Sequence, residues 1–286
     1  MPRVTRDGVS LHYEYNPAGE ETVVFVQGLG VGRWLWHWQR EAFVDEYTLL
    51  LPDNRGTGDS DAPLPRLIPR LPRKLRLLYF IKIGGYSIPD MAADLNAVLA
   101  DAGVECAHIV GASMGGMIAQ QYALDYDRTA SLSLLCTTHG GDEAVPIPEE
   151  TQQQIFDTPE DVSEREKVRH RMKPAISETF MEENPETIEQ ILDWRLAQDA
   201  GEVAREAQGA AGVNFDVSER VHEIDLPTLV LHGTDDRVLP AENGRLIAEK
   251  IAPARLELLE GAEHLLMVER APDVNSLLES FLAEQR

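Results

Sequence analysis

The sequence of 286 residues predicts an α/β fold, with a mostly parallel sheet of about eight strands and helices on both of its faces. Short runs rich in β-branched residues and leucine alternate with segments of helical period, as expected when crossover helices connect parallel strands. A polar segment without strand signals interrupts this alternation once. We therefore expect one large α/β domain that carries a helical insertion.

The expected strands and helices follow one another along the chain. The first segment, Met1–Tyr15, is expected to form a hairpin, because residues alternate in polarity on either side of the turn pair Asp7 and Gly8. Further strands are expected at residues 22–27, 47–52, 107–112, 130–137, 228–232 and 255–260. Helices are expected at residues 34–46, 89–102, 114–126, 241–251 and 272–283.

The interruption extends from residue 141 to residue 212, where the sequence is polar, acidic and helical in period. Its apolar side chains fall on one face of a helix, namely Ile188, Ile191, Leu192 and Leu196. We therefore expect residues 1–140 and 213–286 to form the core domain and residues 141–212 to form a helical cap, or lid. A ligand would bind between the sheet and the cap.

The chain is strongly acidic, with 49 Asp and Glu against 26 Lys and Arg and a formal net charge of −23. Nucleic acid is therefore disfavoured as a partner, since a polyanion would be repelled. Such a composition resembles that of proteins from salt-in halophiles, where molar salt shortens the Debye length to about 3 Å and screens carboxylate repulsion. An ordinary acidic enzyme from a low-salt cell is the alternative.

The apolar runs fall far short of the roughly 20 residues of a membrane-spanning helix. The two cysteines, Cys106 and Cys136, lie in runs that resemble buried strands, and we expect both to be small core residues. Their wide spacing fits neither a zinc site nor a disulfide framework, which suits a reducing compartment. We expect a soluble cytoplasmic protein with no metal and no cofactor.

A glycine-flanked serine occurs in Gly111–Gly115, where an apolar strand passes directly into a helical pattern. By itself Gly-x-Ser-x-Gly is a weak signal, because glycine and serine are common residues. Between a strand and a helix, however, the motif predicts a sharp, strained turn that raises the Ser113 hydroxyl above the sheet. Ser113 is therefore the candidate nucleophile.

A serine hydroxyl needs a base to accept its proton, and the base needs an acid to orient it. Both residue types follow later in the chain. The strand at 228–232 runs into a loop with Asp235 and Asp236, and the strand at 255–260 leads to His264. Because adjacent side chains point in different directions, only one of the two aspartates can face the histidine.

These motifs, in this order, resemble the α/β-hydrolase superfamily over essentially the whole chain. The matching segments are Gln27–Gly30, Asp53–Ser60, Gly111–Gly115, Gly233–Pro240 and Gly261–His264. The resemblance implies an α/β-hydrolase fold and a triad of Ser113, Asp236 and His264, since the acid is the fourth residue of the family's aspartate motif. It also implies an oxyanion hole formed by the backbone N–H groups of Leu29 and Met114.

Some side chains near these motifs are candidates for the pocket wall. Trp34 follows the oxyanion loop, and Met117 and Met267 lie close in sequence to the proposed catalytic residues. They could form a pliable apolar pocket, or they could simply belong to the core.

Gln27 stands where family members usually carry histidine, but the donor of the oxyanion hole is a backbone group and does not depend on that side chain.

A serine nucleophile in this family implies a hydrolase that cleaves a small carboxylic ester or lactone through an acyl-enzyme on Ser113. Thioesterases, perhydrolases and hydrolases of C–C bonds next to a ketone are alternatives with the same residues. Haloalkane dehalogenases and epoxide hydrolases are disfavoured, because they need an aspartate nucleophile. A ligand receptor without turnover is the rival from another class, since the fold alone does not determine function.

One segment is basic, in contrast to the acidic chain as a whole. Residues 62–89 contain no acid, and their basic residues are Arg66, Arg70, Arg73, Lys74, Arg76 and Lys82. Pro69 and Pro72 delay any helix until about Arg73. We expect either a lid element whose basic face pairs with the acidic cap, or a surface at residues 66–82 that docks on anionic lipid.

We expect the midpoint of thermal unfolding to rise steeply between dilute buffer and molar KCl, because the added salt screens repulsion among the carboxylates. Calorimetry at a fixed pH over a series of KCl concentrations measures this shift. A midpoint that does not change with KCl would favour the alternative, an ordinary acidic enzyme from a low-salt cell.

Overall fold

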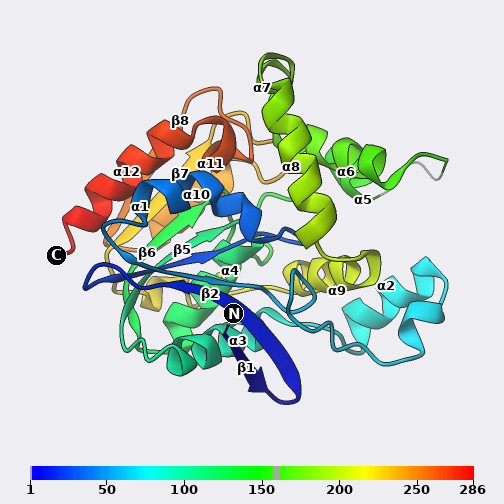
Figure 1. Ribbon diagram of the computed structural model, residues 1–286, viewed down its shortest axis with the longest axis horizontal. Helices are drawn as coiled ribbons and strands as arrows, with labels where there is room; N and C mark the ends of the chain where they lie inside the picture. The colour runs from blue at the N-terminus through cyan, green and yellow to red at the C-terminus, as the bar shows by residue number, and fades with distance from the viewer. Residues whose placement is uncertain (1, 157–160) are drawn as a thin grey trace.

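The computed structural model describes residues 2–156 and 161–286 and contains an eight-stranded sheet (Figure 1). The strands are β1 (Arg3–Arg6), β2 (Val9–Asn16), β3 (Thr22–Val26), β4 (Thr48–Pro52), β5 (Ala107–Ala112), β6 (Thr129–Leu135), β7 (Thr228–Gly233) and β8 (Ala254–Leu259). Their order across the sheet is β1-β2-β4-β3-β5-β6-β7-β8. The β1–β2 and β2–β4 pairs are antiparallel and all other pairs are parallel. The predicted fold class is confirmed.

The chain begins with the predicted hairpin. Arg6 pairs with Val9, so that Asp7 and Gly8 form the two-residue turn between β1 and β2. Both turn residues have positive φ, 49° and 80°, as a type I′ turn requires. The turn pair identified in the sequence therefore sets the register of the hairpin.

Helices cover both faces of the sheet. They are α1 (His37–Phe43), α3 (Ile88–Asp101), α4 (Met114–Asp125), α10 (Glu242–Lys250), α11 (Leu266–Glu269) and α12 (Ala271–Ala283), with the 3-10 turns η1 (Arg33–Trp36), η2 (Ile68–Arg70) and η4 (Val221–Glu223). Leu95, Ile118 and Ile247 bury α3, α4 and α10 in one core cluster. Phe43 and Leu278 bury α1 and α12 in the other. Figure 1 shows α3 and α12 on opposite sides of the sheet.

The helical segment expected at residues 141–212, called the insertion below, lies between β6 and β7. Its helices are α5 (Glu149–Phe156), α6 (Glu164–Met172), the 3-10 turn η3 (Lys173–Ala175), α7 (Glu178–Glu183), α8 (Pro185–Gln198) and α9 (Glu202–Val213). The part of the insertion that the structure describes contains no strand. At its base Gly140 and Asp216 form an antiparallel bridge, so the segment leaves and rejoins the core at one place.

The two cysteines have different environments, and the expectation that both are core residues is wrong for one of them. Cys136 is buried, but Cys106 is exposed. Cys106 lies just before the first residue of β5, in the turn that enters the strand, where side chains still reach solvent.

None of the helices in the described ranges combines the length and apolar character needed to cross a membrane.

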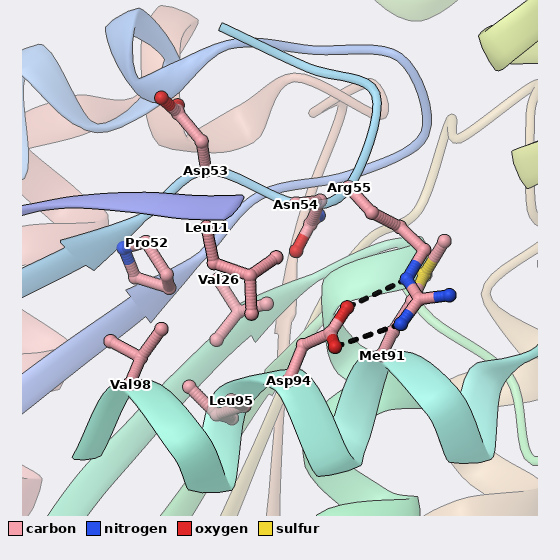
Figure 2. A pocket seen from close by; sticks show the side chains of 10 residues that line it. All are labelled: Leu11, Val26, Pro52, Asp53, Asn54, Arg55, Met91, Asp94, Leu95 and Val98. Carbon is pink, nitrogen blue, oxygen red and sulfur yellow. Dashed lines mark hydrogen bonds and ion pairs between the residues drawn. The ribbon is translucent and has the colours of Figure 1, made fainter. Parts of the chain in front are cut away.

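The loop after β4 is held in place by a buried ion pair. Arg55 donates from Nε and Nη2 to the two carboxylate oxygens of Asp94 on α3, at 2.6 and 2.8 Å. Figure 2 shows Arg55 extending from the loop to Asp94, beside a cavity of about 10 Å³ that has room for a single water. Two parallel hydrogen bonds fix the direction of the arginine as well as its position. The loop is thereby tied to a helix of the core.

The basic segment forms the helix α2 (Arg73–Lys82), which begins at the predicted residue. Arg76 donates from Nε and Nη2 to the carboxylate of Glu206 on α9, at 2.7 and 2.9 Å, and it also bonds Glu202. Arg73 pairs with Glu206 as well, at 3.4 Å. These contacts support the interpretation of residues 62–89 as a lid element whose basic face pairs with the insertion.

The opposite face of α2 is apolar and open to solvent. Its exposed side chains, together with those that flank the helix, are Leu67, Leu75, Leu78, Ile81 and Ile83. Arg76 therefore points inward, whereas Leu75 and Leu78 point outward. Docking of residues 66–82 on anionic lipid stays a prediction, which vesicle co-sedimentation would test.

We expect Arg76→Gln to lower the free energy of unfolding by on the order of 2 kcal/mol, because it leaves the buried carboxylate of Glu206 without its main partner. Lys74→Gln is the matched control, since Lys74 is exposed on the same helix. Urea denaturation of both variants at one salt concentration measures the difference. Equal stabilities would show that the α2–α9 ion pairs contribute nothing.

Candidate active site

Ser113 lies at a sharp turn between β5 and α4. Its backbone has φ 54° and ψ −120°, which is strained for a residue with a side chain. The turn requires the two glycines of the motif. A Cβ at Gly111 would collide with the carbonyl of Gly115, and a Cβ at Gly115 would collide with the carbonyl of Val26. The sequence motif therefore has a steric cause at both glycines.

The loop after β3 lies directly against this serine. A Cβ at Gly28 would be 3.3 Å from the Cβ of Ser113. The backbone N–H of Leu29 has no acceptor among the described residues, and Met114 is the first residue of α4, where N–H groups have no partner within the helix. Two free N–H donors are thus available beside Ser113, as an oxyanion hole requires.

Gln27 anchors this loop from inside the core. Its side-chain Nε2 donates to the carbonyl of Pro52 at 2.7 Å, and its own carbonyl accepts from Asn54 Nδ2 at 3.0 Å. The side chain is fully buried and does not line the cavity that contains Ser113. Gln27 therefore joins the end of β3 to the end of β4.

Asp236 and His264 come from the loops after β7 and β8. Nδ1 of His264 lies 2.8 Å from Oδ2 of Asp236. The other carboxylate oxygen accepts the N–H groups of Val238 and Leu239, each at 2.8 Å. Asp235, in contrast, is exposed. Of the two candidate aspartates, Asp236 is the one that faces the histidine.

The carboxylate of Asp236 is held in its ionised form. Burial would raise the pKa of Asp236, but the charge of His264 and hydrogen bonds from His232 and His264 outweigh burial and hold this pKa well below its usual range. Nε2 of His232 lies 3.3 Å from Oδ2 of Asp236 and 2.8 Å from the carbonyl of Leu239. An ionised Asp236 favours the tautomer of His264 with a proton on Nδ1, which leaves Nε2 free to accept a proton.

Ser113 and His264 line one cavity of about 450 Å³, which lies between the carboxyl ends of the strands and the insertion. Trp34, Met117 and Met267 also line it. No hydrogen bond joins Ser113 Oγ to His264 within the described ranges. Such bonds are commonly long in sites without substrate and tighten when a substrate binds.

Two groups of residues could in principle hold a metal ion in the described part of the chain. They are Cys136 with His232 and Asp236, and His12 with Asp53 and Asp59. In the first group, burial raises the pKa of the Cys136 thiol well above its usual range, so the thiolate ligand is disfavoured. In the second group, the guanidinium of Arg33 contacts both His12 and Asp53 and would repel a cation.

Three arginines of the insertion also line the cavity, and the sequence analysis missed them. They are Arg171 on α6, Arg195 on α8 and Arg205 on α9. The insertion is rich in charged residues, so the number of arginines gives no sign of which of them face inward. One sequence signal was available for Arg171, because it falls three residues after the buried Val168 and so on the same face of its helix.

A model of the α/β-hydrolase fold family matches residues 21–271. The chain belongs to this family. A 3-oxoadipate enol-lactonase from Acinetobacter baylyi is 26% identical over 98% of this chain and 95% of that protein. A 2-hydroxy-6-oxo-6-phenylhexa-2,4-dienoate hydrolase from Comamonas testosteroni is 29% identical, over 95% of this chain and 91% of that protein.

Among solved structures, a thermophilic esterase from Thermogutta terrifontis is 26% identical and has a TM-score of 0.76, with coverage of 100% of this chain and 99% of that one. The expected α/β-hydrolase fold and the expected enzyme class are therefore confirmed. These proteins are named for different substrates, so the family by itself does not name the substrate of this chain.

We expect Asp236→Asn to lower kcat for hydrolysis of 4-nitrophenyl acetate roughly a thousandfold or more, because an amide favours the wrong tautomer of His264. Asp235→Asn is the matched control, since its side chain is exposed, and it should change kcat little. Circular dichroism of both variants checks that the fold is retained. A larger loss in Asp235→Asn would assign the acid to the other aspartate.

Proposed function

We propose that the protein is a serine hydrolase that cleaves a carboxylic ester or a lactone through an acyl-enzyme on Ser113. The observation that supports this most directly is the shared cavity: a serine on a strained turn lies with a histidine that is bonded to an ionised aspartate. Free N–H groups at Leu29 and Met114 add a binding site for negative charge on oxygen. The enol-lactonase and the esterase among the relatives agree with this class of substrate.

In the first step of the proposed reaction, Oγ of Ser113 attacks the carbonyl carbon while Nε2 of His264 accepts the hydroxyl proton. Asp236 stabilises the imidazolium that results. The N–H groups of Leu29 and Met114 bind the oxyanion of the tetrahedral intermediate. The C–O bond to the alcohol then breaks, and His264 gives its proton to the leaving oxygen.

The second step releases the acid. A water molecule gives a proton to His264 as its oxygen attacks the carbonyl of the acyl-enzyme. The tetrahedral intermediate uses the same oxyanion hole. When it collapses, the bond to Ser113 breaks and His264 returns the proton to the serine oxygen. With a lactone, the alcohol and the acid leave as one molecule.

Other bonds can be cleaved by the same residues. The relative from Comamonas testosteroni is named for hydrolysis of a dienoate that bears a ketone, which supports a C–C hydrolase as the second candidate. Thioester hydrolysis and perhydrolysis also use a serine nucleophile of this kind. We rank esters and lactones first because they are the commonest substrates of the family.

The insertion is proposed to act as a cap over a core of residues 1–140 and 213–286. Its helices α5, α6, α8 and α9 all supply side chains to the wall of the cavity. Access to Ser113 therefore depends on how this segment sits on the sheet. A cytoplasmic enzyme adapted to high salt belongs to the same proposal, supported by the net charge of −23.

We expect a fluorophosphonate probe to label the wild-type protein and to leave Ser113→Ala unlabelled, because the Ser113 hydroxyl is the proposed covalent centre. A panel of esters and lactones, assayed at low and high salt, should show hydrolysis that Ser113→Ala abolishes. Thermal unfolding of the variant checks that its fold is intact. A wild-type protein that is neither labelled nor active on the panel would favour a ligand receptor.

A further inference from the structure

The wall of the active-site cavity carries an excess of positive charge. Three arginines line it, namely Arg171, Arg195 and Arg205, whereas Asp199 is the single carboxylate among the described lining residues. Asp199 accepts from Arg195 Nε at 2.7 Å and from Trp34 Nε1 at 2.8 Å. This pair neutralises Arg195. Asp199 also attracts Arg171 and Arg205 but bonds neither of them, so three arginines against one carboxylate leave a net positive charge among the described lining residues.

The guanidinium groups of Arg171 and Arg205 make no hydrogen bond and no ion pair with any residue that the structure describes. Burial and the charges of neighbouring arginines lower the pKa of both side chains, and the pKa of Arg171 falls to about 10. At neutral pH Arg171 therefore keeps its charge. Two half-buried cations without partners are unfavourable in a free protein, and such pairs are expected where a ligand supplies the opposite charge.

Three other acids whose charges attract these arginines are bonded to other side chains. Glu202 and Glu206, on the same helix as Arg205, both bond Arg76 of α2. Glu164, on the same helix as Arg171, accepts from Lys167 at 2.8 Å. The positive charge therefore persists although the insertion as a whole is acidic.

Arg205 and Ser113 pack against the same short loop. A Cβ at Gly30 would be 3.1 Å from Cγ of Arg205, and a Cβ at Gly28 would be 3.3 Å from Cβ of Ser113. Gly28 and Gly30 are two residues apart, so their Cα atoms are separated by at most about 7 Å. Arg205 and the nucleophile therefore face one cavity from opposite ends of the oxyanion loop.

The helix that carries Arg205 is fixed to the oxyanion loop by Gln208. Oε1 of Gln208 accepts the N–H of Gly30 at 2.6 Å. Its Nε2 donates to the carbonyl of Arg55 at 2.8 Å and to Thr57 Oγ1 at 2.9 Å. With all three bonds made in the core, the position of Arg205 relative to Ser113 is set by the fold.

We propose that Arg171 and Arg205 form a subsite for a carboxylate of the substrate, so that the enzyme acts on esters or lactones of acids that carry a second, free carboxylate. This inference rests on the proposed function. The planar fork of a guanidinium matches the two oxygens of a carboxylate. Leu29, Val31 and Met117 line the same cavity and offer apolar surface to the carbon chain.

The test compares two esters with the same acyl chain and leaving group, 4-nitrophenyl hydrogen glutarate and its neutral methyl ester. At pH 7 and constant ionic strength, we expect the wild-type enzyme to favour the acid ester at least about tenfold in kcat/KM. Arg171→Gln and Arg205→Gln should each lower this ratio, chiefly by raising KM for the acid ester. The double variant should lose the preference.

Arg165→Gln is the matched control on α6. Arg165 pairs with Glu189 and Asp193 and does not line the cavity, so its loss should leave the ratio of the two esters unchanged. A preference that survives in the double variant, or a wild-type preference for the neutral ester, would overturn the proposal.

A binding measurement separates this inference from the proposed function. Titration of Ser113→Ala with glutarate should give a Kd that Arg171→Gln/Arg205→Gln, made in the Ser113→Ala protein, raises at least about tenfold. If neither ester is hydrolysed, the proposed function fails, and this titration still decides the subsite. Equal glutarate affinity in the two proteins would overturn it. Inorganic phosphate that competes as strongly as glutarate would overturn the assignment to a carboxylate.

Discussion

The backbone at the turn of Ser113 packs closely against the end of β3, and glycines occupy the points of contact. Gly115 meets the carbonyl of Val26, and Gly28 meets Ser113 itself. β3 and β5 must therefore be neighbours in the sheet, as they are. The strained turn is also fixed from the other side, because the N–H of Ser113 donates to the carbonyl of Leu135 on β6 at 2.9 Å. Three strands thus hold the nucleophile in position.

The same kind of contact brings the acid and the base together. A Cβ at Gly233, the last residue of β7, would collide with the carbonyl of Ala262 in the loop after β8. Asp236 and His264 follow these two residues closely in the chain, so the approach of the two backbones places their side chains within hydrogen-bonding distance. Close glycine contacts at both pairs of loops thus bring the nucleophile, the acid and the base to one edge of the sheet.

These contacts explain why so much could be predicted from the sequence. A glycine that no other residue can replace leaves a visible motif, and strands buried on both faces leave apolar runs, so the eight strands and the order of the motifs were apparent. Asp235 and Asp236 could not be separated from spacing alone, because the answer depends on which carboxylate meets the N–H groups of Val238 and Leu239. The family motif was needed for that choice.

Other features could not be predicted because they depend on contacts between distant segments. Arg171 faces the cavity, whereas Arg165 on the same helix pairs with Glu189, and the charged sequence of α6 allows either orientation. Cys106 has a neighbourhood typical of a strand but lies one residue outside it. In α2 Arg76 is buried beside Phe80 while Leu75 and Leu78 are exposed, because α9 offers Glu206 as a partner for the arginine.

The insertion is joined to the oxyanion loop by a series of hydrogen bonds from backbone N–H groups to side chains. The N–H groups of Gly30, Gly32 and Trp34 donate to the side chains of Gln208, Asp199 and Gln198. In laboratory evolution, exchange of the whole segment with that of a relative would loosen the loop that binds the oxyanion. New specificities are better sought by point substitutions in the cavity wall that leave these three side chains in place.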